Sequence, residues 1–181
     1  VDATDTHLDF QMRTNANLNS TCNAYYDGSS INMYSSGSGC NNTGFSTVVT
    51  HEAGHWANDR YNSGNGSDGF GEGNADVWSM YIYDTPIVGA GFFTTGGYIR
   101  NGLNTRQYCG DGNNGCYGQV HADGEVLMGA LWKVRARLIA TLGTTAGELT
   151  ADTLFLGTMN AYNDSTITSL IEEHWLVLDD D

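Results

Sequence analysis

The most informative segment of this sequence is His51-Glu52-Ala53-Gly54-His55. It lies in a helical pattern that we expect to extend over residues 46–61. Residues four apart in an α-helix lie one turn apart on the same face, so His51 and His55 can bind one metal ion together. Glu52 lies beside that face and can accept a proton from a water molecule at the metal. This spacing is typical of two zinc ligands with a general base between them.

Two details of this predicted helix bear on its surroundings. Ser46 or Thr47 is the expected N-cap, because a hydroxyl side chain can accept hydrogen bonds from free backbone amides. Gly54 costs about 1 kcal/mol relative to alanine inside a helix. The glycine makes sense if another backbone packs closely against it, so we expect a close contact beneath the metal ligands. The simpler alternative is a pair of helical histidines without a metal.

A catalytic zinc site usually has three protein ligands and a fourth position for water or substrate. The third ligand does not follow the metzincin spacing, which requires Gly and His where this chain has Asn58 and Tyr61. Glu72 and Asp76 instead lie four residues apart in a second helical pattern, and hence on one face. Glu72 can reach the metal, while Asp76 can accept the free ring N–H of His51. Without a metal, the two carboxylates would merely complement the helix dipole.

The segment Gly71-Glu72-Gly73-x-x-Asp76, downstream of the histidine pair, resembles the gluzincin zinc metallopeptidases. It is most similar to the fungalysin-like branch, which is related to thermolysin. Three further segments agree in the same order: Asn23 to Gly28 followed by Ile31 to Tyr34, Tyr98 to Asn101, and Val120 to Val126. The resemblance extends from about residue 20 to the C-terminus. It implies a zincin-like α+β fold that is mostly helical, with an active-site cleft between an N-terminal β/α part and a C-terminal helical part.

The resemblance also implies roles for residues in these segments. Asn23 and Ala24 would bind an extended peptide by adding it to an edge strand. Arg100 would donate hydrogen bonds to a substrate carbonyl. His121 would hold the oxyanion that develops at the scissile bond, a contribution of about 3–4 kcal/mol. If the neighbouring residues did not resemble the family, the simpler interpretation would be that Arg100 is a solvated surface residue. His121 would then be a residue at a helix N-terminus without a catalytic role.

The pocket for the residue after the scissile bond lies, in the resembled families, beside the zinc helix and the substrate arginine. The matching positions here are Val48 and Ile99, which are both apolar. Burial of apolar surface contributes about 25 cal/mol per Å², so Leu, Ile or Phe should be favoured there. We therefore expect cleavage mainly on the N-terminal side of bulky apolar residues.

Two catalytic positions depart from the family pattern. The acidic residue that the thermolysin pattern has five residues before His121 is replaced by Cys116, and Asp111 is the candidate substitute. In the family, a tyrosine that contacts the oxyanion lies between the helix with the two histidines and the helix with the third zinc ligand, which correspond here to residues 46–61 and 72–84. Tyr61 is the only tyrosine in that interval, but its spacing differs.

The calcium positions depart as well. Thr47 and Tyr83 stand where the family has acidic calcium ligands, so its double calcium site is not expected. The Asp- and Asn-rich loops 62–68 and 111–114 could bind calcium in another way, although such loops are more often turns.

The chain has 181 residues, of which 40% are hydrophobic, and this is enough for one core. We expect a single catalytic domain over residues 1–181, with a zinc-binding α/β part at about 1–85 and a helical part at about 120–181. The region 85–119 is expected to be irregular. Besides the helix at 46–61, the patterns predict strands near 7–13 and 31–35 and helices near 72–84, 121–142, 150–163 and 165–177.

Charge and cysteine content narrow the setting. The net charge of −14 argues against a nucleic-acid partner, and no run of 18 apolar residues is present to span a membrane. The four cysteines fit no zinc spacing. Each sequential pair flanks a Gly/Asn-rich loop, so Cys22–Cys40 and Cys109–Cys116 are the natural disulfides among three connectivities. Disulfides imply an oxidising, extracellular compartment.

Together these features predict a secreted zinc endopeptidase, which we expect to be a monomer with one zinc per chain and protein or peptide substrates. Zinc would be held by His51, His55 and Glu72, with Glu52 as the general base and His121 at the oxyanion. Family members are made with a propeptide, so one is expected in the precursor. Two alternatives stay open. One is a catalytically inactive relative that binds peptides, and the other is an aminopeptidase, which needs acidic residues to hold the substrate amine.

Overall fold

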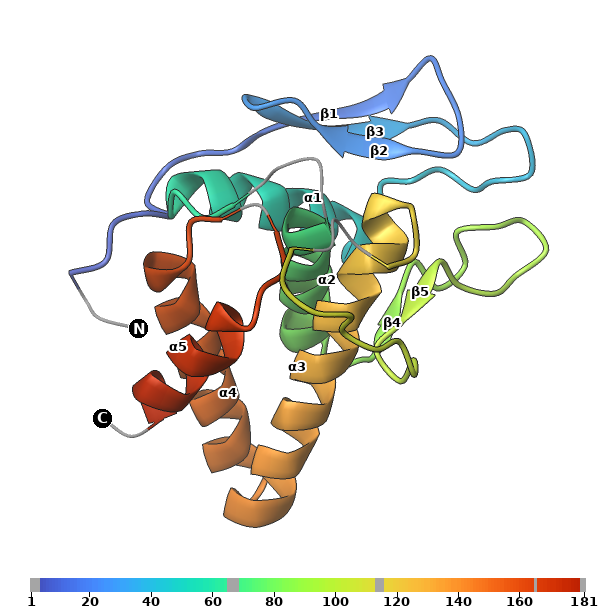
Figure 1. Cartoon of the computed structure of the whole chain (residues 1–181). Coiled ribbons are helices and arrows are strands. Elements are labelled where there is room, and N and C mark those ends of the chain that lie inside the picture. The colour runs from blue at the N-terminus through green and yellow to red at the C-terminus, as the bar shows by residue number, and fades with distance from the viewer. Residues whose placement is uncertain (1–3, 65–68, 113–115, 165, 180–181) are drawn as a thin grey trace.

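The computed structural model describes residues 4–64, 69–112, 116–164 and 166–179 of the chain. Within these ranges the fold is α+β, as expected, with five helices and two small sheets (Figure 1). The helices are α1 Ser46–Arg60, α2 Gly69–Tyr83, α3 Val120–Leu142, α4 Thr144–Ala161 and α5 Leu170–Asp179. The strands are β1 Arg13–Leu18, β2 Ala24–Tyr26, β3 Ser30–Tyr34, β4 Ile87–Val88 and β5 Arg100–Asn101.

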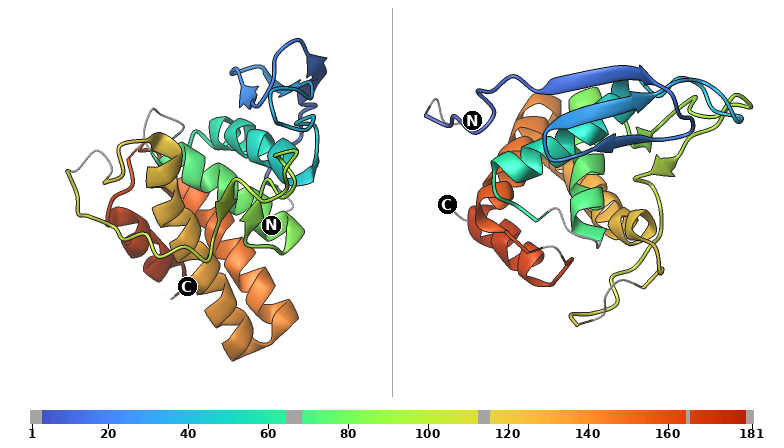
Figure 2. Two further views of the ribbon diagram at one scale, coloured as in Figure 1. Left: turned by 90° about the vertical axis from the view of Figure 1, so that its right-hand side faces the viewer. Right: turned by 90° about the horizontal axis from the view of Figure 1, so that it is seen from above.

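The three-stranded sheet lies over α1, on the side away from the other helices (Figures 1 and 2). Its order is β1-β3-β2, with β3 parallel to β1 and antiparallel to β2. The buried side chains of Ile31 and Met33, on β3, form a small apolar cluster with Val48 of α1. β2 is therefore an edge strand, in the segment where the family resemblance places one.

Residues 7–12 form no strand, so the strand predicted near 7–13 is wrong and the first strand begins at Arg13. The N-terminal residues instead contact the C-terminal end of α1 through side chains. The Tyr61 hydroxyl donates to Asp5 at 2.8 Å, and Arg60 donates to the carbonyl of His7 at 2.9 Å. These side-chain contacts take the place of a backbone ladder in this segment.

Some helix ends differ from the predictions. α2 begins at Gly69 rather than near residue 72, while α1 covers nearly the predicted range but has a different N-cap. The N-cap of α1 is Phe45, whose side chain cannot accept a hydrogen bond. Thr47, one of the two expected caps, instead accepts the backbone N–H of Gly89 on its Oγ1 at 3.0 Å. α4 begins at Thr144 rather than near 150, since Gly143 has φ 84° and reverses the chain directly after α3. α5 begins at Leu170, and the predicted start at residue 165 lies outside the described residues.

Most of the buried apolar side chains belong to one cluster between α2, α3, α4 and α5. Its fully buried members include Phe70, Val77, Met80, Met128 and Met159. The smaller cluster beneath the sheet is separate from it. α2 contributes Phe70, Val77 and Met80 to the larger cluster, and α1 contributes Val48 to the smaller one.

Glycines allow the three central helices to approach closely. A Cβ atom at Gly54 of α1 would lie 2.7 Å from the Cα of Ala75 on α2. A Cβ at Gly124 of α3 would lie 2.7 Å from the backbone nitrogen of Gly73 on α2. The close contact expected at Gly54 is therefore present, and it brings the histidine pair of α1 beside α2. The second contact brings the first turn of α3 to the same place.

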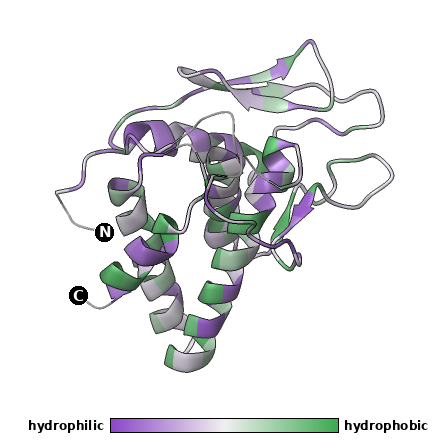
Figure 3. Cartoon of the chain, in the orientation of Figure 1, coloured by the Kyte–Doolittle hydropathy of each residue, from purple (hydrophilic) through white to green (hydrophobic). Residues whose placement is uncertain are grey.

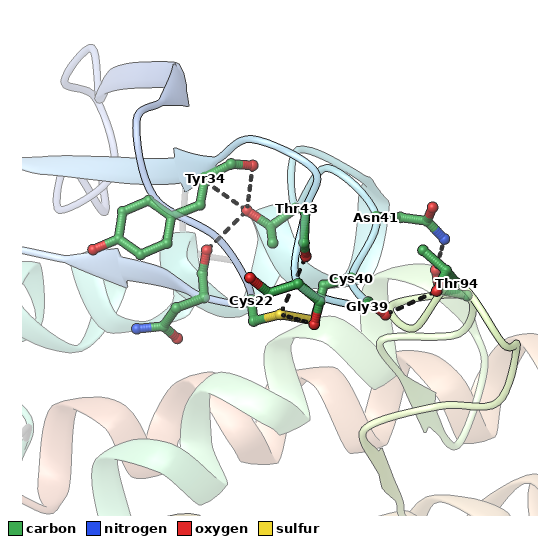
Figure 4. The surroundings of a disulfide bond; sticks show 11 residues. Cys22, Tyr34, Gly39, Cys40, Asn41, Thr43 and Thr94 are labelled. Atoms are coloured by element: carbon green, nitrogen blue, oxygen red, sulfur yellow. Dashed lines mark hydrogen bonds between the residues drawn. A yellow bond between two sulfur atoms is a disulfide. The ribbon is translucent and has the colours of Figure 1, made fainter.

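Both predicted disulfides are present, Cys22–Cys40 with a Cα–Cα distance of 5.2 Å and Cys109–Cys116 with 6.2 Å. Figure 4 shows the first of them beside the loop that carries Thr94. Thr94 Oγ1 donates to the carbonyl of Gly39 at 3.1 Å. The disulfide therefore joins Cys22, just before β2, to the loop at Cys40. The hydrogen bond from Thr94 joins that loop to the 89–97 segment.

None of the described helices is both long and apolar enough to cross a lipid bilayer. Figure 3 shows hydrophilic residues interrupting α3, which at 23 residues is the longest of them.

Candidate metal centre

The side chains of His51, His55 and Glu72 converge where α1 and α2 touch, and they could hold a metal ion. The two Nε2 atoms of the histidines are 3.2 Å apart. Glu72 Oε2 lies 3.1 Å from Nε2 of His51 and 3.7 Å from Nε2 of His55. The spacing of four residues on α1 and the close contact at Gly54 together account for this convergence.

The donor set fits a zinc-sized ion. Glu72 Oε2 is a buried carboxylate oxygen that, among the described residues, has no hydrogen bond of regular geometry. Zinc bonds of about 2.0–2.1 Å in a tetrahedron require donor atoms about 3.3 Å apart. The observed separations, from 3.1 to 3.7 Å, lie close to this value. An unsatisfied buried oxygen opposite two imidazole nitrogens is the arrangement that a bound cation would complete.

Asp76 and Arg100 orient the first of these ligands. Asp76 Oδ1 lies 2.8 Å from Nδ1 of His51, as the sequence predicted, and Asp76 is fully buried. Arg100 donates to both oxygens of Asp76, from Nε at 2.6 Å and from Nη2 at 2.8 Å. The carboxylate thus fixes the imidazole ring so that Nε2 faces the centre. The contact between Arg100 and Asp76 was not predicted, because Arg100 was expected to contact only substrate.

The ionisation of the centre follows from this pairing. Burial disfavours a charged imidazole, but the carboxylates of Asp76 and Glu72 outweigh it and raise the pKa of His51 to about 10. Burial also disfavours a charged carboxylate, yet the two imidazoles hold the pKa of Glu72 far below its usual range. A metal must therefore displace a proton from His51 when it binds.

Glu52 lies beside the ligand set without joining it. Glu52 follows His51 directly in the chain, and its buried side chain lines a cleft that also contains the three candidate ligands. Burial raises the pKa of the Glu52 carboxyl above its ordinary value, although the nearby imidazoles oppose this shift. A carboxylate with a raised pKa accepts a proton more readily than an ordinary one, which is the property required of a general base.

His121 reaches the centre from the first turn of α3. Its Nε2 lies 3.2 Å from Glu72 Oε2, and its side chain is 42% exposed. Partial burial lowers the pKa of this imidazole below its ordinary value. The residue that contacts its Nδ1 is Gln119, at 2.7 Å.

The acidic partner suggested for His121 was wrong. Asp111 accepts hydrogen bonds from the backbone N–H and the hydroxyl of Ser169, at 2.8 and 2.7 Å, and also from Tyr108. Cys116 is in a disulfide. Gln119 was missed because an amide has no charge to mark it. Its one signal in the sequence is its place two residues before His121, just ahead of the predicted helix.

These groups open into a cleft of about 870 Å³. The cleft is lined by all five residues that the sequence assigned to substrate binding: Asn23, Ala24, Val48, Ile99 and Arg100. The structure adds Phe92 and Glu125 to the lining. Phe92 packs in the apolar cluster of Val48, so this part of the cleft is hydrophobic.

Tyr61 lies outside the cleft lining, and its proposed contact with an oxyanion is wrong. Its hydroxyl donates to Asp5, and its ring stacks on His7 with centroids 4.6 Å apart. Of the two loops considered for calcium, residues 65–68 of the first and 113–114 of the second lie outside the described residues. In the described part, Asp111 already accepts the hydrogen bonds from Ser169.

A comparison of the chain with protein-family models finds no model that matches, and a comparison with curated proteins finds no match either.

Proposed function

We propose that this protein is a zinc-dependent endopeptidase with a zincin-like fold, related to the fungalysin-like gluzincins. One observation carries the proposal. Two imidazoles and a buried, unsatisfied carboxylate oxygen converge at spacings suited to zinc, directly beside the buried carboxyl of Glu52. A structural metal site would require neither a general base at this position nor a substrate-sized cleft in front of it.

The residues of the chain have separate tasks in this proposal. Bound zinc supplies Lewis acidity toward a substrate carbonyl and a water molecule. Glu52 takes a proton from the attacking water and passes it to the leaving amine. His121 donates from Nε2 to the developing oxyanion, with Arg100 nearby. The edge strand β2, with Ala24 at its start and Asn23 just before it, binds the extended peptide backbone along the cleft.

The cleft favours an endopeptidase over an aminopeptidase. An aminopeptidase holds the free amine of its substrate with carboxylates. Glu125 lines the cleft, but its Oε2 accepts from Nε of Arg106 at 2.6 Å, and this pairing neutralises its charge. The disulfides are compatible with the extracellular location that the proposal includes, together with a propeptide in the precursor.

The proposal is tested by measuring zinc content and casein hydrolysis on the same preparation, before and after a chelator. We expect about one zinc per chain, loss of hydrolysis with the chelator and recovery with added zinc. Full hydrolysis by metal-free protein would overturn the mechanism. Peptides of equal length with blocked and free N-termini then separate the two peptidase classes, since an aminopeptidase cleaves only the free ones.

Glu52→Gln provides the matched control. Because Glu52 is not a ligand, this variant should keep its zinc and its fold while losing nearly all turnover. A turnover of one tenth of wild type or more would exclude Glu52 as the base. Zinc binding with no turnover in the wild-type protein would favour the inactive, peptide-binding alternative.

A further inference from the structure

The side chain of Gln119 has a defined orientation. Gln119 is the N-cap of α3, and its Oε1 accepts from the backbone N–H of His121 at 2.9 Å and of Ala122 at 3.1 Å. Both partners can only donate, so the oxygen of the amide must face them. The amide nitrogen is therefore the atom that faces the ring, 2.7 Å from Nδ1 of His121.

This orientation determines which ring nitrogen of His121 carries the hydrogen. An amide NH₂ group can donate but cannot accept, so Nδ1 must accept with its lone pair. In a neutral imidazole the hydrogen is then on Nε2. That nitrogen points to the metal centre, 3.2 Å from Glu72 Oε2. His121 therefore presents an N–H, and not a lone pair, to the centre.

We propose that Gln119 is a positioning residue that holds His121 as the neutral Nε2–H tautomer, ready to donate to the oxyanion. The effect on rate rests on the proposed peptidase function, whereas the tautomer does not. A partly exposed imidazole without this contact could rotate and exchange its tautomers, and in one of them Nε2 has no hydrogen to donate. The amide that caps α3 thus also selects the tautomer of His121 that has a hydrogen on Nε2.

Gln119→Ser separates the two tasks of the side chain. Serine is a good N-cap, so α3 should be kept, but its hydroxyl is too short to reach Nδ1 in place of the amide. We expect normal zinc content, an unchanged KM and a kcat lowered about 10-fold. This is less than the roughly 100- to 1000-fold loss that follows removal of an oxyanion donor. A kcat equal to wild type would overturn the effect on rate.

Gln119→Glu tests the tautomer itself. The substitution keeps the shape and the capping oxygen, but it places an acceptor on Nδ1, which must then carry a hydrogen. Nitrogen-15 NMR of the zinc-loaded protein, with the His121 signals assigned by a His121→Asn variant, should show Nδ1 unprotonated in wild type and protonated in Gln119→Glu.

A protonated Nδ1 in wild type, or an unprotonated Nδ1 in Gln119→Glu, would overturn the proposal. This measurement does not depend on turnover. A protein that binds zinc but lacks peptidase activity would therefore contradict the proposed function while the NMR signals still decide the role of Gln119.

Discussion

His51 and His121 approach the same oxygen of Glu72 from two different helices, but the protein holds their rings in opposite ways. Nδ1 of His51 faces a buried carboxylate, Asp76, which is itself held by Arg100. Nδ1 of His121 faces a neutral amide on a partly exposed helix end. A carboxylate accepts the hydrogen of Nδ1, so Nε2 is the atom that can give up its proton and offer a lone pair to a metal. An amide NH₂ group donates to Nδ1, and the hydrogen of a neutral ring is then on Nε2.

The difference shows how one residue type can serve two chemical tasks in one cleft. In the proposed centre, His51 serves as a metal ligand because its Nε2 can donate an electron pair, and the carboxylate strengthens that donation. In the same proposal, His121 serves as a hydrogen-bond donor because its Nε2 keeps its hydrogen. The partner of His51 is also the more deeply buried one. Asp76 is fully buried, and its ion pair with the guanidinium of Arg100 offsets the cost of removing the carboxylate from water.

The largest effect is expected from removing the first of these rings. His51→Ala leaves only His55 and Glu72 of the ligand set, so zinc content should fall well below one per chain and hydrolysis should be lost. Metal analysis of the purified variant, with circular dichroism as a check of the fold, measures this. A full zinc complement in the folded variant would show that His51 is not a ligand.

Removing the second ring should have a different result. His121→Ala should keep about one zinc per chain, while kcat falls roughly 100- to 1000-fold, the usual cost of one oxyanion donor. Zinc analysis together with casein or peptide kinetics tests the prediction. Loss of zinc in this variant would move His121 into the ligand set and would remove the contrast with His51.

The partner of His51 can be changed without removing the ring. Asp76→Asn is nearly isosteric, but an amide that donates to Nδ1 would impose on His51 the tautomer proposed for His121. We expect zinc affinity to fall about 10- to 100-fold, the typical cost of losing such a partner. Titration against a competing chelator measures it. Unchanged affinity would mean that the carboxylate does not prepare the ligand.

A smaller effect, on the side-chain preference of cleavage, is expected at the apolar side of the cleft beside α1. Val48 and Ile99 should favour Leu, Ile or Phe after the scissile bond, with only about 1–3 kcal/mol between similar side chains. Digestion of a mixed peptide library, followed by sequencing of the products, gives the preference. New N-termini dominated by Lys, Arg, Asp or Glu would contradict this assignment of the pocket.

The last effect concerns the stability, and not the activity, of chelated, metal-free protein. The pKa of His51 is raised to about 10 in the folded state, so its proton stabilises the fold fully below the ordinary value of 6.5. This contribution is lost as the pH rises from 6.5 to about 10. We expect the free energy of unfolding to fall over this interval in wild type and to fall less in His51→Asn. Denaturant unfolding at a series of pH values measures this free energy. An equal pH dependence in the two proteins would contradict the raised pKa.

Much of the centre could be predicted from the sequence, because it depends on local helical spacing. His51 and His55 lie four residues apart, as do Glu72 and Asp76, and any helix places such pairs on one face. Gly54 indicated the close contact with α2. The disulfides also joined cysteines that are near in sequence, where few pairings compete.

The tertiary structure alone decided what depends on the path of loops and on contacts between distant segments. Tyr61 lies in the expected interval, yet the N-terminal residues hold it at Asp5. Asp111 is acidic and near His121 in sequence, but its loop turns it to Ser169. The contact of Gly124 with α2 brings His121 to Glu72, and the cap of α3 then turns an uncharged amide to the ring. Spacing along the chain predicts which residues share a helix face, but the partner of each ring nitrogen depends on the packing of the helices.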